Sequence, residues 1–226
     1  HISTLHIWWA RRPLAACRAV TCAALWPNPA PGNDDAPCPA AFIETARREM
    51  LAWTSHERQK LLGAESRARF EAARQKPTLF AEPLLLRGAL LDFIADFANW
   101  DNSTVREFLD TSRVLTQSAH EALGGAAGTR PLVVDPFAGG GSIPLEALRI
   151  GADVFASDLN PIPVLLNKLV LEDIPKYGRH LATEVRKWGA WVRSEAQKEL
   201  TEFYPKGPDG EAAIAYLWAR TISCEG

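Results

Sequence analysis

The sequence predicts an α/β fold in which a mostly helical region precedes a partial parallel sheet. Up to about residue 125 the chain is rich in Ala, Leu, Glu, Arg and Gln, which favour helices. After Gly128, short apolar runs alternate with helical segments that glycines delimit. Strands that alternate with helices predict a parallel sheet with right-handed crossovers and with helices on both faces.

The composition is that of a soluble globular protein of about one domain. Of the 226 residues, 47% are hydrophobic and 23% are charged, and no apolar run reaches the roughly 20 residues that cross a bilayer. The formal charge is −2, so a nucleic acid would have to be bound by a local basic patch. The four cysteines are too sparse for a disulfide scaffold. We therefore expect a cytoplasmic protein that does not enter the membrane. Because the only Met is Met50, we also expect the sequence to be an excerpt of a longer chain.

Four helical stretches are predicted before the sheet. The first covers residues 13–26 and is followed by a proline-rich loop over 27–39. Helix formers then fill residues 40–75 and 82–100.

A fourth helix is predicted over residues 104–123. Thr104 and Glu107 have the spacing of a capping pair at its start, and Gly124 and Gly125 end it.

Residues 44–76 carry eight basic and five acidic side chains, a local excess of three positive charges. A solvated helical face and a phosphate-contacting surface both agree with this pattern.

The sheet region begins with an apolar strand over 131–135, a glycine cluster and a helix over 142–150 that Gly151 ends. A second strand covers 153–158 and precedes a helix over 162–172. Farther on, residues 178–203 predict a helix that contains Trp188 and Trp191. An edge strand is predicted at the end of the chain, where the alternating residues are Ile214, Tyr216, Trp218 and Ile222.

The glycine cluster is the most informative feature. Gly139, Gly140 and Gly141 follow the first strand, where missing Cβ atoms allow a ligand to approach the backbone and a helix amino terminus. Asp158 follows Gly139 by 19 residues, at the end of the second strand, where an acid accepts hydrogen bonds from ribose hydroxyls. The spacing differs from Gly-x-Gly-x-x-Gly, and Asp135 would repel a diphosphate but suits the amino group of a methionine moiety.

These segments resemble known motifs. Asp135-Pro136-Phe137-Ala138-Gly139-Gly140-Gly141-Ser142 resembles the S-adenosylmethionine (SAM) motif of the amino-methyltransferases, and Asp158-Leu159-Asn160-Pro161 resembles their ribose-binding motif. The run from His6 to Leu14, with Trp8-Trp9-Ala10-Arg11-Arg12-Pro13, and the run from Phe155 to Lys168 resemble the amino-terminal part of adenine-specific DNA methylases that carry a zinc ribbon.

The resemblance implies a partial Rossmann-like, SAM-dependent methyltransferase sheet after the helical region. It implies an amino-terminal segment over 1–26, a helical insert over 27–128 and the truncated first part of the methyltransferase domain over 129–226. The implied activity is SAM-dependent adenine methylation of duplex DNA with the target base flipped, in restriction-modification or anti-phage defence, with other defence-system subunits as partners.

The resemblance also implies site residues. Those implied for the cofactor are Asp135, Pro136, Phe137, Ala138, Gly139, Gly140, Gly141, Asp158, Leu159, Asn160, Trp8, Trp9 and Pro13. Arg11 and Arg12 are implied for a nucleic-acid phosphate, although Trp8 and Trp9 as core aromatics and Arg11 as a surface charge agree equally well with the sequence. Cys224 would open the zinc ribbon, but no set of metal ligands is evident.

The base-binding motif of amino-methyltransferases contains two consecutive prolines, and Pro-Pro does not occur in these 226 residues. We interpret Asn160-Pro161-Ile162-Pro163 as a helix start, predict no catalytic residue, and expect the isolated chain to hold part of the cofactor pocket without transferring a methyl group. Two alternatives stay open: an RNA guanine amino-methyltransferase, and a non-catalytic scaffold that retains a nucleotide pocket.

Overall fold

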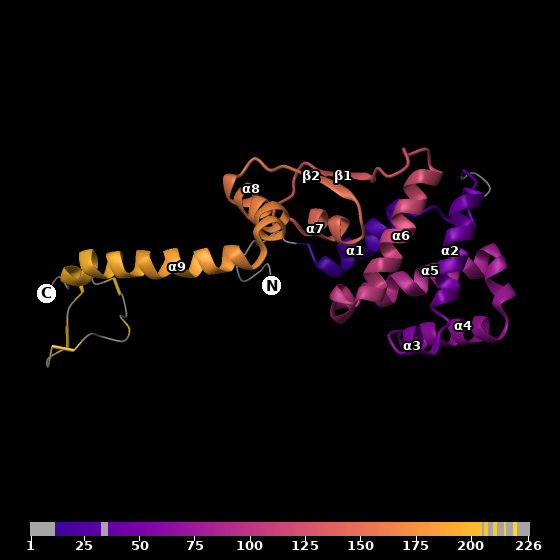
Figure 1. Ribbon diagram of the computed structural model, residues 1–226, viewed down its shortest axis with the longest axis horizontal. Helices are drawn as coiled ribbons and strands as arrows, with labels where there is room; N and C mark the ends of the chain where they lie inside the picture. The colour runs from indigo at the N-terminus through magenta and orange to yellow at the C-terminus, as the bar shows by residue number, and fades with distance from the viewer. Residues whose placement is uncertain are drawn as a thin grey trace, which may run out of the picture. The chain divides into compact units, whose positions relative to one another are not determined.

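The computed structural model describes residues 12–32 and 36–204, together with 206, 207, 210, 211, 215, 219 and 220. Contacts divide the chain into two units, residues 1–175 and 176–226, which are described separately. In the first unit the helices are α1 (Leu14–Leu25), α2 (Ala40–Ala52), α3 (His56–Gln59), α4 (Ala64–Gln75), α5 (Pro83–Phe97), α6 (Arg106–Ala122), α7 (Ser142–Arg149) and α8 (Pro161–Asn167), and the strands are β1 (Leu132–Asp135) and β2 (Asp153–Ala156) (Figure 1).

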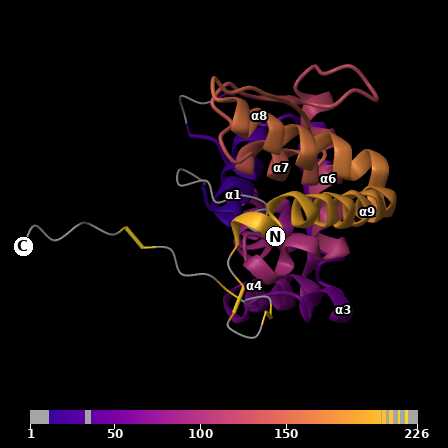
Figure 2. The same ribbon diagram turned by 90° about the vertical axis from the view of Figure 1, so that its left-hand side faces the viewer.

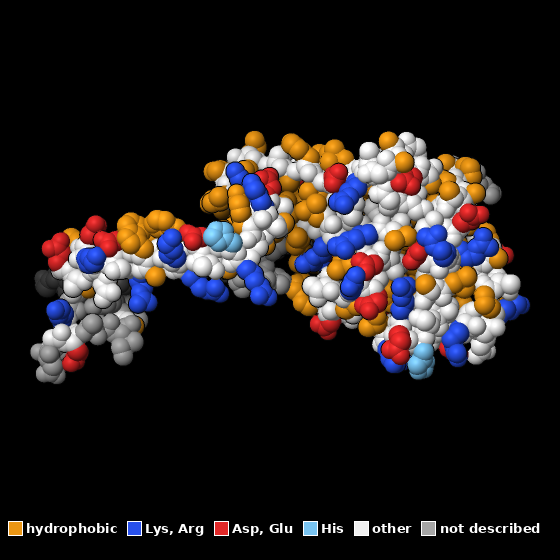
Figure 3. Space-filling model, viewed as in Figure 1, with side chains coloured by type: hydrophobic (Ala, Val, Ile, Leu, Met, Phe, Trp, Pro, Cys, Tyr) orange, Lys and Arg blue, Asp and Glu red, His pale blue; other side chains and the backbone are white. Residues whose placement is uncertain are grey.

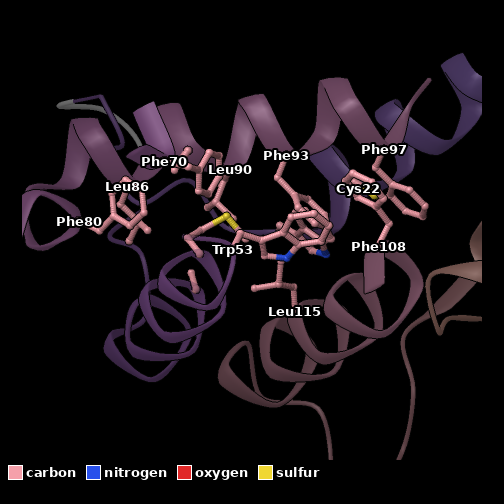
Figure 4. Close-up of a cluster of buried hydrophobic side chains, with 14 of the residues drawn as sticks. Cys22, Trp53, Phe70, Phe80, Leu86, Leu90, Phe93, Phe97, Phe108 and Leu115 are labelled. Carbon is pink, nitrogen blue, oxygen red and sulfur yellow. The ribbon is translucent and has the colours of Figure 1, made fainter. Parts of the chain in front are cut away.

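The main core lies among the helices α1, α2, α4, α5 and α6. Trp53 is fully buried at its centre, with its ring centroid 4.5 Å from that of Phe108 and 5.2 Å from that of Phe93 (Figure 4). Its indole Nε1 donates to Thr111 Oγ1 at 3.0 Å, so the one polar atom of the ring is satisfied. Burial of each such aromatic side chain contributes about 1.5–3 kcal/mol, so this helical core is the main source of stability in the unit.

The predicted helical segments are confirmed, but the stretch over 40–75 is divided into α2, α3 and α4, and one predicted cap is wrong. The pair Thr104 and Glu107 does not start α6, because Thr104 ends a 3-10 helix that begins at Trp100, and Val105 is the N-cap. The side chain of Asn99 caps the 3-10 helix by accepting from Asp101 N at 3.3 Å. Val105 packs against the core in an extended conformation, so hydrophobic burial places the start of α6 after it.

Both predicted strands of the first unit are confirmed and pair in parallel, with Leu132 opposite Asp153 and Asp135 opposite Ala156. The crossover helix α7 contacts both strands.

The prediction that helices cover both faces of the sheet is wrong for the described residues. Leu132, Val134 and Phe155 are each more than half exposed and share one face by register. Figure 3 shows hydrophobic side chains gathering over β1, β2 and α8. Only the face that holds the half-buried Val133 and Val154 meets α7, because the side chains of a strand alternate between its two faces.

The second unit consists mainly of the helix α9 (Ile174–Leu200), which confirms the predicted helix. Gly178, with φ 52°, interrupts its helical backbone near the start. The exposed rings of Trp188 and Trp191 meet edge to face, with centroids 5.9 Å apart. The edge strand predicted on Ile214, Tyr216, Trp218 and Ile222 lies outside the described residues. Among the helices that are described, none is long and apolar enough to cross a membrane.

Candidate cofactor site at the glycine loop

The glycine loop, residues 136–141, joins β1 to α7 and is tied to the ends of both strands. The amide of Ala138 donates to Ser157 O at 3.0 Å, and the amide of Ser157 donates to Asp135 O at 3.0 Å. The carboxylate of Asp135 accepts from the amide of Phe137 at 3.2 Å. These bonds hold the loop at the carboxyl ends of two parallel strands, which is where open α/β sheets bind ligands.

Asp158 contacts the glycine loop directly. Its Oδ2 accepts from the amide of Gly139 at 2.9 Å, and its Oδ1 accepts from the amide of Asn160 at 2.9 Å. A carboxylate has about four acceptor positions, so each oxygen keeps one for a further donor. The structure thus brings together the two features that the sequence placed 19 residues apart.

Gly141 is required by its conformation and by its neighbour. Its backbone is left-handed, with φ 73° and ψ 23°, where glycine alone is free of strain. A Cβ atom at this position would lie 2.3 Å from Asn167 Oδ1. Asn167, from the end of α8, therefore occupies the space that a side chain on Gly141 would need.

Asn167 is a residue of this site that sequence reasoning missed. Its side chain is 7% exposed, and its Nδ2 donates to Gly139 O at 3.0 Å and to Pro163 O at 2.8 Å. Its Oδ1 is buried and makes no hydrogen bond within the described chain. One feature of the sequence could have indicated Asn167: it is an amide side chain in the otherwise apolar run before Lys168. In the structure it is buried together with Leu166 of α8.

The other residues predicted for the cofactor site differ in their exposure to solvent. Phe137 and Leu159 are strongly exposed, at 80% and 97%, whereas Ala138 is buried. The side chain of Asn160 accepts from the amide of Ile162 at 3.0 Å and caps α8, which confirms the helix-start interpretation.

The structure describes only some of the site residues that are predicted at the amino terminus. Pro13 is the exposed N-cap of α1, and Arg12 is exposed beside it. Trp8, Trp9 and Arg11 lie outside the described residues. The described end of this segment reaches the loop, because Ser142 Oγ donates to Arg12 O at 2.9 Å.

Four of the eight basic side chains of residues 44–76 form ion pairs, and one of their partners, Asp92, lies outside this stretch. Ion pairs join Arg48 to Glu49 at 3.0 Å, Lys60 to Glu57 at 2.9 Å, Arg69 to Asp92 at 2.6 Å and Arg74 to Glu71 at 2.6 Å. This pairing favours the solvated helical face over a phosphate-contacting surface.

No metal site is evident in the part of the chain that the structure describes, where no three potential metal-ligating side chains cluster. Burial raises the pKa of the Cys22 thiol to about 12, and burial is also the largest cause that raises the pKa of Cys17. Both thiols are therefore protonated at neutral pH, which disfavours metal binding and nucleophilic chemistry. Cys224 lies outside the described residues.

The charge of the loop fits a cationic nucleoside ligand better than a diphosphate. Within the described ranges, neither Asp135 nor Asp158 forms an ion pair with a basic side chain. Two unpaired carboxylates at the mouth of a loop repel phosphate and favour ammonium, sulfonium and hydroxyl groups. Strand, glycine loop, helix and acid-ended strand together form a β-α-β unit of the kind that in other proteins binds nucleoside cofactors.

Family comparisons identify the unit more narrowly. Residues 126–204 match the D12 class N6 adenine-specific DNA methyltransferases, and this match supports a DNA adenine methyltransferase. Residues 1–51 match a protein family of unknown function, DUF1156. A search of curated proteins and a search of solved structures each gave no match. Neither the RNA methyltransferase nor the scaffold alternative gains support from these matches.

Proposed function

We propose that the glycine loop and Asp158 form part of the SAM site of a DNA adenine methyltransferase. The observation that carries this proposal is the contact of Asp158 Oδ2 with the amide of Gly139 at 2.9 Å, in a domain segment of the D12 class. The contact places an acid with spare acceptor capacity beside backbone that a ligand can approach closely. Methyltransferases in general use SAM as the methyl donor, and the charges of this loop suit it.

Each side chain has a distinct proposed role. Asp158 accepts hydrogen bonds from the ribose hydroxyls, and Asp135 faces the ammonium group of the methionine moiety. Phe137 is 80% exposed and supplies apolar contact to the bound nucleoside. When bound, SAM would supply an electrophilic methyl group on its sulfonium. The loop would orient that group and exclude water from it.

The amino-terminal roles remain proposals. Trp8, Trp9 and Pro13 would pack near the cofactor, and Arg11 and Arg12 would contact a phosphate of duplex DNA whose target adenine is flipped out. The segment over 1–26, the helical insert over 27–128 and the methyltransferase part over 129–226 are the proposed divisions. We also propose that β1 and β2 are the first pair of a Rossmann-like sheet.

Calorimetry on the full chain, with SAM and with NAD in parallel titrations, tests the proposal. Binding of SAM but not of NAD is expected. Asp158→Ala should weaken SAM binding by about tenfold to a hundredfold, because hydrogen bonds to a charged group contribute about 1.5–3 kcal/mol. Asp101→Asn, at an exposed carboxylate of the 3-10 helix that begins at Trp100, is the control and should leave affinity unchanged. Failure to bind SAM, or preference for NAD, would overturn the assignment.

A further inference from the structure

A buried ion pair joins α1 to α7, immediately behind the glycine loop. Arg18 Nε lies 2.7 Å from Glu146 Oε2, and the two side chains are 1% and 0% exposed. The other carboxylate oxygen of Glu146 accepts from Arg149 Nη1 at 2.5 Å. Figures 1 and 2 show α1 and α7 lying side by side, and this helix pair is in direct contact.

The surroundings of Arg18 are only partly suited to its charge. Its Nη1 donates to the carbonyl oxygens of Phe97 and Asn99, and its guanidinium lies 4.8 Å from the ring centroid of Phe97. Its Nη2 is buried and makes no hydrogen bond within the described chain. Burial of charges costs several kcal/mol, and apolar replacements are often neutral or stabilising, so stability alone gives little reason for this pair.

The geometry gives a different reason, because α1 and the residue before its N-cap form hydrogen bonds with α7 at two points that are one helical turn apart on α7. Ser142, the first residue of α7, donates to the carbonyl of Arg12, and Glu146 binds Arg18. Positions i and i+4 lie on the same face of a helix, so both bonds act on one side of α7. Together they fix the rotation and the axial position of α7 relative to α1.

That orientation determines where the glycine loop lies. Gly141 directly precedes Ser142 and is the N-cap of α7, so the loop moves with this helix. On its other side the loop is held by Asp158 and Asn167 through Gly139. The loop is thus held between α1, which belongs to the segment of unknown function, and the end of the second strand.

We propose that α1 is a positioning element for the SAM site and that Arg18 is a positioning residue that acts through Glu146 on the glycine loop. This inference rests on the proposed function and assigns a role to residues that match only a family of unknown function. Arg18 does not touch the cofactor in this proposal. It sets the direction in which the loop amides and the amino terminus of α7 point.

The test separates positioning from stability with four variants of the full chain. Arg18→Met and Glu146→Gln each disturb the pair, and Arg18→Met combined with Glu146→Met removes both buried charges. Arg69→Met breaks a second interhelical pair, Arg69 to Asp92, which joins α4 to α5 and whose side chains are 38% and 28% exposed. Thermal unfolding is measured for each variant, together with SAM affinity by calorimetry.

We expect Arg18→Met to lower Tm and to raise the Kd for SAM by about tenfold, equivalent to about 1.4 kcal/mol. The double variant should recover Tm but keep the raised Kd, and Arg69→Met should change Tm alone. Glu146→Gln keeps the shape of the side chain and therefore gives a folded variant, with a threefold or larger rise in Kd.

Three outcomes are decisive. If the folded variants bind SAM as the wild type does, or if the double variant recovers both Tm and Kd, Arg18 has only a structural role and the inference is wrong. If the wild type itself does not bind SAM, the proposed function fails instead.

Discussion

Replacement of Gly141 by alanine gives the sharpest test of the loop geometry. The backbone at this position is left-handed, with φ 73°, which costs a residue with a Cβ about 1–2 kcal/mol. The new Cβ would also lie 2.3 Å from Asn167 Oδ1, so Asn167 must move. That movement breaks its bonds to Gly139 O and Pro163 O, each contributing about 0.5–1.5 kcal/mol. We expect Gly141→Ala to lower the free energy of unfolding by about 2–5 kcal/mol and to weaken SAM binding.

A matched control separates conformational strain from the clash. Gly128 has a similar positive φ of 77°, but a Cβ there would meet nothing within 4 Å. Gly128→Ala should therefore cost only the strain, about 1–2 kcal/mol, and should leave SAM affinity unchanged. Urea unfolding followed by circular dichroism measures both variants, with calorimetry for the ligand.

A double-mutant cycle then tests the assigned partner. Asn167→Ala removes the obstructing oxygen, so its combination with Gly141→Ala should cost about 1–2 kcal/mol less than the sum of the two single changes. Costs that add within about 0.5 kcal/mol would show that the two residues do not interact. Equal costs for Gly141→Ala and Gly128→Ala would refute the proposed clash.

Three further predictions concern the rest of the fold. Burial raises the pKa of Cys22 to about 12, so the folded state holds this proton after the unfolded chain has lost it above about pH 9. Unfolding free energy should fall by about 1.4 kcal/mol per pH unit between these values, and denaturant unfolding at pH 8 and pH 11 should show a smaller loss for Cys22→Ala. Trp53→Ala should cost about 3–5 kcal/mol, measured by urea unfolding, because it empties the aromatic core and leaves Thr111 without its donor; a loss below 1 kcal/mol would contradict the central role of this ring. Asn160→Ala should lower thermal stability by about 1 kcal/mol through loss of the α8 cap, and unchanged stability would argue against that cap.

The local parts of the site could be predicted from the sequence. A short apolar run predicts each strand, and three successive glycines predict a backbone that a ligand can approach. The spacing from Gly139 to Asp158 spans one crossover unit, so it places the acid at the end of the next strand. The structure confirms this placement, because the acid binds the amide of Gly139.

The residues that hold the loop from outside could not be predicted in this way. Arg18 and Glu146 are 128 positions apart, and Arg18 lies in an alanine-rich run where a basic side chain suggests an exposed position. Asn167 lies 28 positions from Gly139 in an apolar helix. The periodicity of apolar residues indicates which face of a helix is buried, but it does not indicate which distant segment of the chain covers that face. The start of α6 shows the same limit, because packing of Val105 determines it rather than a capping motif.

Buried polar atoms without a hydrogen bond occur both beside the glycine loop and in the helical region. Of the four such side-chain atoms in the described part of the chain, Asn167 Oδ1 lies at the loop and Arg18 Nη2 lies in the ion pair that joins α1 to α7. The other two, Arg58 Nη1 and Asp96 Oδ2, belong to the helical region, where Arg58 lies over the ring of Trp53. The helical core around Trp53 is built from apolar and aromatic side chains, with its indole nitrogen satisfied. An unsatisfied buried polar atom costs about 1–3 kcal/mol of folding stability. Such side chains are therefore tolerated only where the surrounding structure is stable enough to offset that cost. The helical region that precedes the sheet provides that stability, and through α1 and the pair of Arg18 with Glu146 it also acts on the position of the loop.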